Sequence, residues 1–326
     1  MTILFAGGEL DAFVQPNGSS LGVNTSTSYY DPDFSSCACN ATESLPLVAP
    51  LVTPISEMWA HAVYRPENSS STTVLLQVRS SNGQGVVRIS SNNGTLQFQY
   101  WNGSSWTNIG ASFSPSGLNQ VDVHVKIADS GGMFELYYNG ILAASYTGDT
   151  NLFSGANCAD LWMGSTWNNS SFPTRWSQVI LTDTMDTRAM KLATIRPNGA
   201  GTTDQWAGSY TDVDEVGIFN DSDYISSGTP NQVELFTMTD LSPTAQTLDV
   251  LAFVMTGRAR RGAAGPQNLQ AAVRTSGTDY FSGNLPTLSP AFNSLTPTIW
   301  ELNPATSAPW SISDIQGIEA GFKSIA

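Results

Sequence analysis

Paired carboxylates at strand spacing are the first candidates for chemistry in this chain. Three acids spaced Glu-x-Asp-x-x-Glu on one strand would suit glycoside hydrolysis, because alternate strand residues share a face and a retaining mechanism needs two carboxyl groups about 5 Å apart. The chain offers Glu9-Leu-Asp11, but Val14 stands where the third acid is required. The sequence therefore does not predict hydrolysis here. The alternative is that Glu9 and Asp11 are solvated or contact a neighbouring subunit.

The densest acidic cluster comprises Asp212, Asp214, Glu215, Asp221 and Asp223. Asp212 and Asp214 would face the same way on a strand. Calcium takes roughly six to eight oxygen ligands, but the spacing does not match the Asp-x-Asp-x-Asp-Gly calcium loop. A solvated face or turn capping is the favoured interpretation, and we assign no metal ligand.

Tryptophans could bind sugars, because an exposed indole stacks on a sugar ring while nearby amides bind hydroxyl groups. They gather around a predicted hairpin and again before residue 176. The predicted glycan-binding residues are Trp101, Asn102, Trp106, Trp167 and Asn168. The alternative is that these indoles are buried in a hairpin core or at a subunit interface.

Arg258, Arg260 and Arg261 form a basic spot on an otherwise acidic chain. Arginines on a loop can pair with carboxylates in a bidentate manner, so these three are the predicted subunit-contact residues. Pairing with the abundant Asp of the same chain is the alternative.

No catalytic constellation is found. The chain has no phosphate-binding glycine loop, and its two histidines are His61 and His124. His124 shares a predicted strand face with Asp122 and Lys126, so a cross-strand hydrogen bond is its expected role. We predict a protein that is not an enzyme and needs no cofactor or metal.

The three cysteines are too few for a disulfide framework. Cys37 and Cys39 share a face if they lie on a strand, and Cys158 is distant. A bridge from Cys158 to one of them and three free thiols are the two alternatives, and the odd count leaves at least one free thiol.

Composition restricts the class of partner. Of 326 residues, 12% are charged and 40% hydrophobic, and Asp plus Glu outnumber Lys plus Arg by 27 to 13, for a net charge of -14. This charge disfavours nucleic acid and anionic lipid and favours protein or glycan partners. No apolar run reaches the ~20 residues of a membrane-spanning helix. The N-terminus lacks the features of a signal peptide, so synthesis in the cytosol is expected.

Short alternating segments separated by Asn-Gly pairs predict antiparallel hairpins, because both positions of a type I′ turn need positive φ. The predicted strands are 73–79, 85–90, 94–100, 121–127, 133–138 and 141–146. This region resembles the laminin G and concanavalin A-like lectin/glucanase sandwich. The residues that carry the resemblance are Val121 to Lys126 and Glu135 to Gly140, a strand and a following hairpin. The resemblance implies a jelly roll, and function does not follow from such a fold.

Pro197 to Thr203 breaks the periodicity, so we place a domain boundary near residue 200 and expect this loop to order on assembly. Beyond it, strands are predicted at 232–238, 247–256, 268–275 and 317–325, with a helical turn over 311–316 capped by Ser311 or Ser313.

The stretch Trp176 to Ser227 resembles a recurrent segment of tailed-bacteriophage virion proteins. The matching residues are Ser177, Val179, Ile180, Asp183, Asp186 to Arg188, Pro197 to Gly201, Trp206, Asp212 to Glu215 and Asp223 to Ser226. The opening Met1 to Glu9, the ending Trp300 to Pro304 and Ala308 to Trp310 are similar to the same family. The resemblance implies a particle component and names no reaction.

Together these features predict an all-β protein with two β-sandwich domains: a concanavalin A/laminin G-like jelly roll over residues 1–200 and a smaller sandwich over 201–326. The expected function is that of a virion structural protein of the tail or baseplate. Its expected partners are other virion proteins, further copies of itself and a host-surface glycan or receptor. We expect no nucleic-acid binding and no membrane insertion, and assembly in the bacterial cytoplasm. The alternatives are a capsid decoration or head-fibre protein and a polysaccharide depolymerase.

Overall fold

The computed structural model describes residues 2–14, 22–24, 31, 33–42, 45–65, 73–92, 95–114, 117–164 and 174–326. The chain divides into two compact units. The first comprises Met1–Gly8, Phe13–Tyr30 and Cys37–Leu192, and the second comprises Glu9–Ala12, Asp31–Ser36 and Ala193–Ala326. Two short N-terminal segments therefore belong to the second unit, although they lie within the first unit in sequence.

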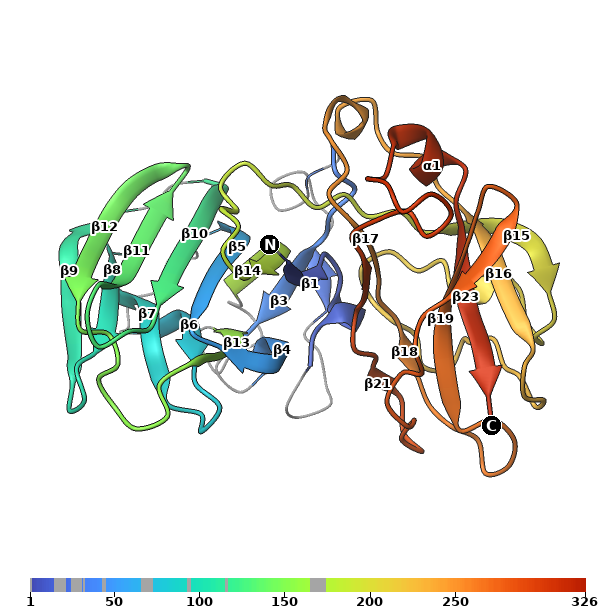
Figure 1. Ribbon diagram of the computed structural model, residues 1–326, viewed down its shortest axis with the longest axis horizontal. Helices are drawn as coiled ribbons and strands as arrows, with labels where there is room; N and C mark the ends of the chain where they lie inside the picture. The colour runs from blue at the N-terminus through green and yellow to red at the C-terminus, as the bar shows by residue number, and fades with distance from the viewer. Residues whose placement is uncertain are drawn as a thin grey trace. The chain divides into compact units, whose positions relative to one another are not determined.

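Two antiparallel sheets build the first unit (Figure 1). The eight-stranded sheet holds, in spatial order, β12 (Ile141–Gly148), β11 (Gly132–Tyr138), β10 (Asn119–Lys126), β5 (Glu57–Arg65), β14 (Thr174–Thr182), β3 (Ala38–Ala41) and β2 (Val23–Asn24), with β1 (Ile3–Gly7) also paired to β14. The six-stranded sheet holds β4 (Leu47–Ile55), β13 (Cys158–Met163), β6 (Thr73–Arg79), β7 (Gly85–Asn92), β8 (Thr95–Trp101) and β9 (Trp106–Phe113). The predicted all-β class is confirmed.

Strand alternation places the core of the first unit between these sheets. Tyr100 of β8 lies 5.8 Å from Phe134 of β11 and 4.7 Å from Tyr146 of β12, measured between ring centroids. Successive strand residues point to opposite faces, so Gln99 and Trp101 point away from the core. Each sheet thus has an apolar inner face and an outer face that carries polar and aromatic side chains.

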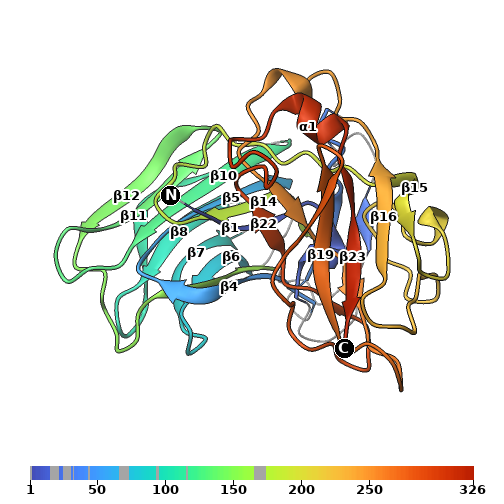
Figure 2. The ribbon, with the colours of Figure 1, turned by 45° about the vertical axis from the view of Figure 1, so that its right-hand side comes forward.

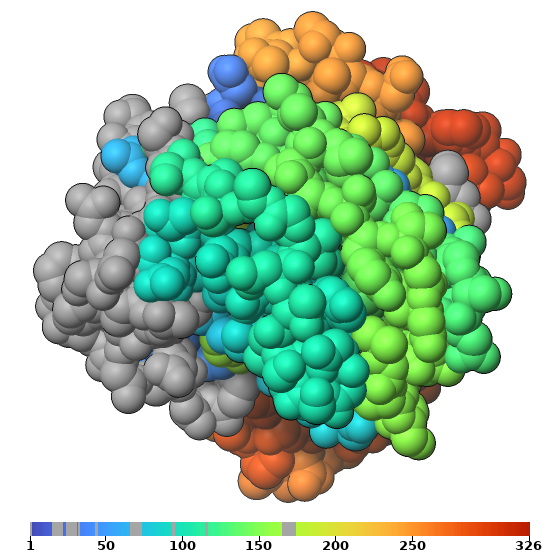
Figure 3. Space-filling view, turned by 90° about the vertical axis from the view of Figure 1, so that its left-hand side faces the viewer, coloured from blue at the N-terminus to red at the C-terminus, as the bar shows by residue number. Residues whose placement is uncertain are grey.

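The edges of the two sheets meet where β9 approaches β12, and Figure 3 shows these strands side by side in teal and light green. The approach needs a glycine, because a Cβ on Gly110 would lie 3.2 Å from the Cβ of Ala144 and the φ of Gly110 is +68°.

The hairpin between β11 and β12 is closed by Asn139 and Gly140, with φ of 50° and 76°. The predicted type I′ turn is confirmed there.

The second unit contains a five-stranded sheet in the order β15 (Pro197–Asp204), β16 (Val233–Met238), β23 (Glu319–Ile325), β19 (Asn268–Thr275) and β20 (Thr278–Phe281), most of which Figure 2 shows side by side. Two short pairs join β17 (Phe253–Met255) to β22 (Thr298–Trp300) and β18 (Arg258–Ala259) to β21 (Asn293–Ser294). The helices are η1 (Leu10–Ala12), η2 (Tyr210–Asp212), η3 (Ala245–Thr247) and α1 (Ile312–Gln316). Its largest core cluster includes Phe253, Val273 and Trp310.

Two expectations about the second unit are wrong. Pro197 to Thr203, expected as a loop that orders on assembly, forms part of β15 and pairs with β16. Its glycines hide the strand in the sequence but permit the pairing, because a Cβ on Gly201 would lie 2.5 Å from the carbonyl oxygen of Leu235. The strand predicted over 247–256 shrinks to Phe253–Met255, since Leu248 and Leu251 are exposed and add nothing to the core. The helical turn capped by Ser311 is confirmed as α1.

Glu9 and Asp11 were expected to be solvated or to contact a neighbouring subunit. The expectation that they are solvated is wrong, because each side chain binds a partner in the same chain. Glu9 forms an ion pair with Arg196, and Asp11 accepts a hydrogen bond of 3.0 Å from the Thr256 hydroxyl. Burial raises the pKa of Glu9 to about 7, with Arg196 opposing and Asp11 adding to the shift. Burial also raises the pKa of Asp11. These two acids fasten the segment around η1 within the second unit.

We predict that the free energy of unfolding of this unit falls as the pH rises from about 4.5 to about 7. A carboxyl with a higher pKa in the folded chain than in the unfolded chain holds its proton more tightly when folded, so raising the pH through this window favours unfolding. In Glu9→Gln the melting temperature, measured by calorimetry from pH 4.5 to 8, should fall less with rising pH than it does in the wild type. Asp240→Asn, at an exposed position of the same unit, should retain it. An unchanged slope in Glu9→Gln would contradict the assignment.

Candidate functional site

A row of side chains crosses the outer face of the six-stranded sheet in direct register. Trp162 of β13 pairs with Gln77 of β6, Gln77 with Arg88 of β7, Arg88 with Gln99 of β8, and Gln99 with Asn108 of β9. We call these five residues the cross-sheet row. Because partners in register share a face, the row is one continuous strip of indole, amide and guanidinium groups over five strands.

Hydrogen bonds hold the centre of the cross-sheet row. The side-chain oxygen of Gln99 accepts from Arg88 Nε at 2.8 Å and from the Ser90 hydroxyl at 3.0 Å. The side-chain nitrogen of Gln99 donates to Asn108 Oδ1 at 2.8 Å. Gln99 therefore has a defined amide orientation, and it fixes one edge of the Arg88 guanidinium.

Trp106 and Trp101 flank the row at the start of β9 and the end of β8. The Arg88 guanidinium carbon lies 4.0 Å from the centroid of the Trp106 ring, which is a cation–π contact. Trp101 meets Trp106 edge to face, with centroids 5.7 Å apart and an interplanar angle of 67°. All three side chains are partly exposed. The indoles and the guanidinium thus form one packed group at the surface.

Two glycines make room for the aromatic rings on this face. A Cβ on Gly85 would lie 2.8 Å from Cη2 of Trp106 and 2.0 Å from the side-chain nitrogen of Gln77. A Cβ on Gly164 would lie 2.1 Å from Cη2 of Trp162. Neither Gly85 nor Gly164 has a positive φ. Their function here is close approach, because both indoles rest where a side chain would otherwise begin.

The polar groups of this face have unused hydrogen-bonding capacity. The Gln77 amide makes no hydrogen bond with any described residue, and neither do the two terminal nitrogens of Arg88. The indole nitrogens of Trp101, Trp106 and Trp162 also have no protein partner in the part of the chain that the structure describes. Groups of this kind are available to a ligand or to solvent.

The predicted glycan-binding residues separate into three outcomes. Trp101 and Trp106 lie on this face, beside the cross-sheet row. Asn102 does not offer its amide, because its oxygen accepts from the Ser104 and Ser105 backbone and its nitrogen donates to Thr107 Oγ1. Trp167 and Asn168 lie outside the described residues. Gln77, Arg88 and Gln99 were not singled out in the sequence. Trp162 belongs to the second group of aromatic residues noted there, but it was not among the predicted binding residues.

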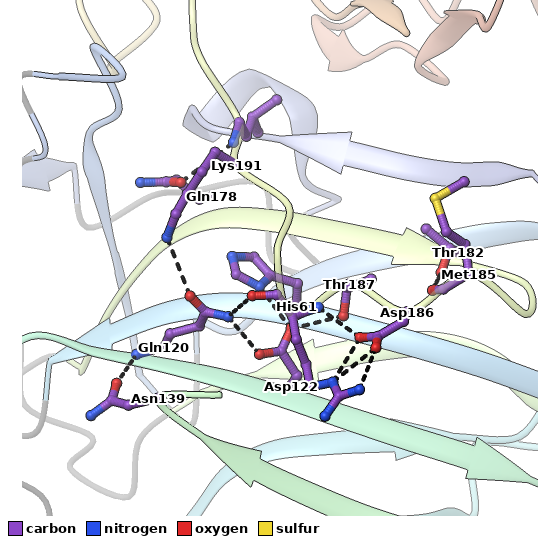
Figure 4. Close-up of polar contacts among 12 residues, drawn as sticks. His61, Gln120, Asp122, Asn139, Gln178, Thr182, Met185, Asp186, Thr187 and Lys191 are labelled. Carbon is purple, nitrogen blue, oxygen red and sulfur yellow. Dashed lines mark hydrogen bonds and ion pairs between the residues drawn. The ribbon is translucent and has the colours of Figure 1, made fainter. Parts of the chain in front are cut away.

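The eight-stranded sheet carries a different polar cluster on its outer face, and Figure 4 shows it in close-up. Asp122 of β10 contacts His61 Nδ1 of β5 at 2.8 Å and accepts from the Thr187 hydroxyl at 2.8 Å through the same oxygen. The side chains of His61 and Asp122 have no exposed surface. Thr187 belongs to the segment that follows β14, so this buried network fastens that segment to the sheet.

Gln120 extends the network along the same segment (Figure 4). Its side-chain nitrogen donates to the second oxygen of Asp122 at 2.8 Å and to the carbonyl oxygen of Arg188 at 2.6 Å. Its side-chain oxygen accepts from Lys191 Nζ at 3.2 Å. Residues 186–191 are therefore held at three points. We call this segment the strap.

Next to the strap, His124 makes the cross-strand hydrogen bonds that the sequence predicts. Its ring nitrogens face Glu135 and Glu57, each at 3.1 Å, and its ring stacks on Trp59 with centroids 4.3 Å apart. Since carboxylates only accept, both nitrogens are satisfied when both carry protons. Arg188 of the strap lies over Tyr137 at 4.3 Å and covers this group.

The predicted subunit-contact arginines lie together in the second unit. Arg258 pairs with Asp221 through two hydrogen bonds, of 3.1 and 2.8 Å, so the intrachain alternative is the one observed for it. Arg260 lies over the rings of Tyr224 and Phe292, and Arg261 donates to Gln267 at 2.7 Å. Arg260 and Arg261 are exposed, and neither forms an ion pair with a described residue.

Within the part of the chain that the structure describes, no three or more His, Cys, Asp or Glu side chains are grouped so that they could bind a metal ion. Asp212 lies in η2 and accepts a hydrogen bond of 2.8 Å from the Ser209 backbone, so it caps a turn and does not share a strand face with Asp214. Among the described residues, none of Cys37, Cys39 and Cys158 forms a disulfide, and all three are buried. Burial raises the pKa of Cys158 well above its ordinary value.

Comparison with solved structures gives weak similarities that extend over about half of the chain. The endo-β-1,4-glucuronan lyase from the fungus Trichoderma reesei is 12% identical, with 56% of this chain and 96% of that chain covered and a TM-score of 0.40. Domain 4 of an extracellular arabinanase from Geobacillus stearothermophilus, in complex with arabinotriose, is 16% identical, with 56% of this chain and 92% of that chain covered and a TM-score of 0.37. A galectin from Caenorhabditis elegans is 10% identical, with 44% of this chain and 95% of that chain covered and a TM-score of 0.32.

The chain matches no protein-family model, and no curated protein sequence matches it. The part of the chain that the structure describes contains no helix long and apolar enough to cross a membrane. The similar structures include lyases as well as binding domains.

We predict that Asp122→Ala destabilises the first unit by about 3 kcal/mol, because it leaves His61 and Thr187 buried without their shared partner. Thr187→Val removes one hydrogen bond and should cost about 1 kcal/mol. Hydrogen exchange of β10 amides in increasing urea, measured by mass spectrometry, localises the effect to this unit. The exposed Asp129→Ala should change stability by no more than about 0.5 kcal/mol. Equal effects of Asp122→Ala and Asp129→Ala would contradict a stabilising network.

We also predict that Gly85→Ala displaces Trp106 and Gln77 without unfolding the sheet. The added methyl group would occupy the position of the Gln77 amide and touch the far end of the indole, and both can rotate outward. Tryptophan fluorescence should shift to longer wavelength as the Trp106 indole becomes more exposed, while the circular dichroism stays that of the wild type. Gly83→Ala is unsuitable as a control because of its positive φ, so Ser81→Ala in the same hairpin serves. An unchanged spectrum in Gly85→Ala would contradict the close approach.

Proposed function

We propose that this chain is a non-enzymatic structural protein of a tailed-bacteriophage particle whose first unit binds a glycan. The observation that carries the binding function is the outer face of the six-stranded sheet, where Trp101 and Trp106 lie beside the cross-sheet row and Trp162 is one of its members. Indoles stack on the apolar face of a sugar ring, and amides donate to and accept from its hydroxyl groups. The unused hydrogen-bonding capacity of Gln77 and Arg88 supports a ligand at this face.

The engagement of the acid and base groups supports a binding protein over a depolymerase. Glu9 pairs with Arg196 and Asp11 with Thr256. Both ring nitrogens of His124 face carboxylates. Groups that transfer protons during catalysis need access to the substrate, and here each of these groups is directed at another part of the same chain.

The particle assignment depends on the resemblance of Trp176 to Ser227 to tailed-phage virion proteins. The Asp186 to Arg188 triplet of that stretch forms the start of the strap, and Pro197 to Gly201 begins β15, so the motif coincides with structural elements of both units. Arg260, exposed and stacked on two aromatic rings, is the arginine best placed to contact a neighbouring subunit. A capsid decoration or head-fibre protein with the same binding face is the second candidate.

The binding function is tested with the purified chain on a bacterial glycan array and on host cells. Trp106→Ala and Trp162→Ala should each weaken binding at least about fivefold, because a stacked aromatic contributes about 1–3 kcal/mol to a bound ring. Phe281→Ala removes an exposed aromatic of the second unit and should bind as the wild type does. Fragments released from the glycan would indicate a depolymerase. Full binding by both tryptophan variants would place the site elsewhere.

A further inference from the structure

Arg88 has an unusual environment for an arginine of this chain. It is partly buried on the six-stranded sheet, and desolvation lowers its pKa. It forms no ion pair with any described residue, although acidic residues outnumber basic ones by 27 to 13. By contrast, Arg79 on the same face pairs with Asp160 through hydrogen bonds of 2.7 and 2.9 Å. The unpaired charge of Arg88 therefore does not reflect a shortage of carboxylates.

The fixed position of the Arg88 guanidinium makes it suitable for recognition. Gln99 binds Nε, and the Trp106 ring lies 4.0 Å from the guanidinium carbon. These two contacts define the plane of the group and leave both terminal nitrogens without a protein partner among the described residues. Such an arrangement loses little side-chain entropy when it binds, which favours affinity.

We propose that the glycan bound at this face is acidic, and that Arg88 pairs with the carboxylate of a uronic-acid residue. This inference rests on the proposed glycan-binding function and deepens it. The carboxylate is planar, so it can meet the guanidinium in one plane through two parallel hydrogen bonds. Trp106 and Trp101 then contact the sugar ring, and the Gln77 amide binds a hydroxyl group.

Charge supports a carboxylated ligand over a neutral one. The hydroxyl groups of a neutral sugar can accept hydrogen bonds from Arg88 but cannot neutralise its charge. A carboxylate accepts two parallel hydrogen bonds and also supplies the opposite charge. The net charge of -14 repels a polyanion at long range. Recognition should therefore depend on the short-range contact at Arg88.

The test compares three sets of soluble polymers. The first is a panel of uronate-containing polymers, namely alginate, polygalacturonate and hyaluronate. The second is the same polymers after reduction of their carboxyl groups, and the third is dextran sulfate. Dissociation constants are measured with the purified full chain by affinity electrophoresis and calorimetry. At least one polyuronate should bind about tenfold more tightly than its reduced counterpart, as expected for one charge-assisted contact. Dextran sulfate is the comparison for sulfate esters, whose oxygens a guanidinium can also meet through two parallel hydrogen bonds, and we expect it to bind more weakly than the preferred polyuronate.

Substitutions assign the preference to Arg88. Arg88→Gln should bind the polyuronate and its reduced counterpart equally, and Arg88→Lys should recover part of the preference because it keeps the charge but not the fork of donors. Arg261→Gln removes the same charge from the second unit and should retain the wild-type preference. Circular dichroism and thermal unfolding show whether each variant is folded.

The possible failures are distinguishable. Equal wild-type affinity for a polyuronate and its reduced form, or a preference that persists in Arg88→Gln, would overturn the carboxylate and leave glycan binding intact. Equal binding of dextran sulfate through Arg88 would overturn the choice of carboxylate over sulfate. Binding to none of these polymers and to no glycan on the array would overturn the proposed function itself.

Discussion

The two-residue alternation of the strands is the constraint on which the first unit depends. In β8, Phe98 and Tyr100 point into the core between the sheets, and this fixes Gln99 and Trp101 on the outside. A shift of one residue in the pairing would exchange these sets, burying an amide and exposing a phenylalanine. The apolar core therefore stabilises the register, and the register in turn aligns the cross-sheet row over five strands. The candidate site is a consequence of the packing on the opposite face of the same strands.

Local features of the fold could be predicted from the sequence, and long-range ones could not. The Asn139-Gly140 turn depends only on the φ preferences of two residues, so it is visible in the sequence. Strand β15 is not visible in the sequence, because Pro197 to Gly201 contains few apolar residues. The strand takes its place at the sheet edge through backbone pairing with β16. The assignment of Glu9–Ala12 to the second unit depends on contacts with residues near 196, 217 and 256. The spacing of residues in the sequence does not predict such long-range contacts.

The same distinction applies to the candidate site. Trp101 and Trp106 could be found because residue type and one hairpin bring them together. Gln77 and Trp162 could not, because they meet only through the pairing of β6 with β13, which are far apart in sequence. The turn-capping role of Asn102 could also be predicted, because in Asn-Gly-Ser-Ser the asparagine side chain can cap its own turn.

The two outer faces of the first unit differ in how far their polar groups are satisfied, and this difference separates structure from recognition. On the eight-stranded sheet, Asp122 has three partners and His124 has two, and the strap covers them. Their hydrogen bonds offset the cost of desolvation within the folded chain. On the six-stranded sheet, Arg88 is partly desolvated, and no carboxylate among the described residues pairs with it. Folding alone gains nothing from that arrangement, whereas a ligand that supplies the missing acceptor would recover the cost upon binding.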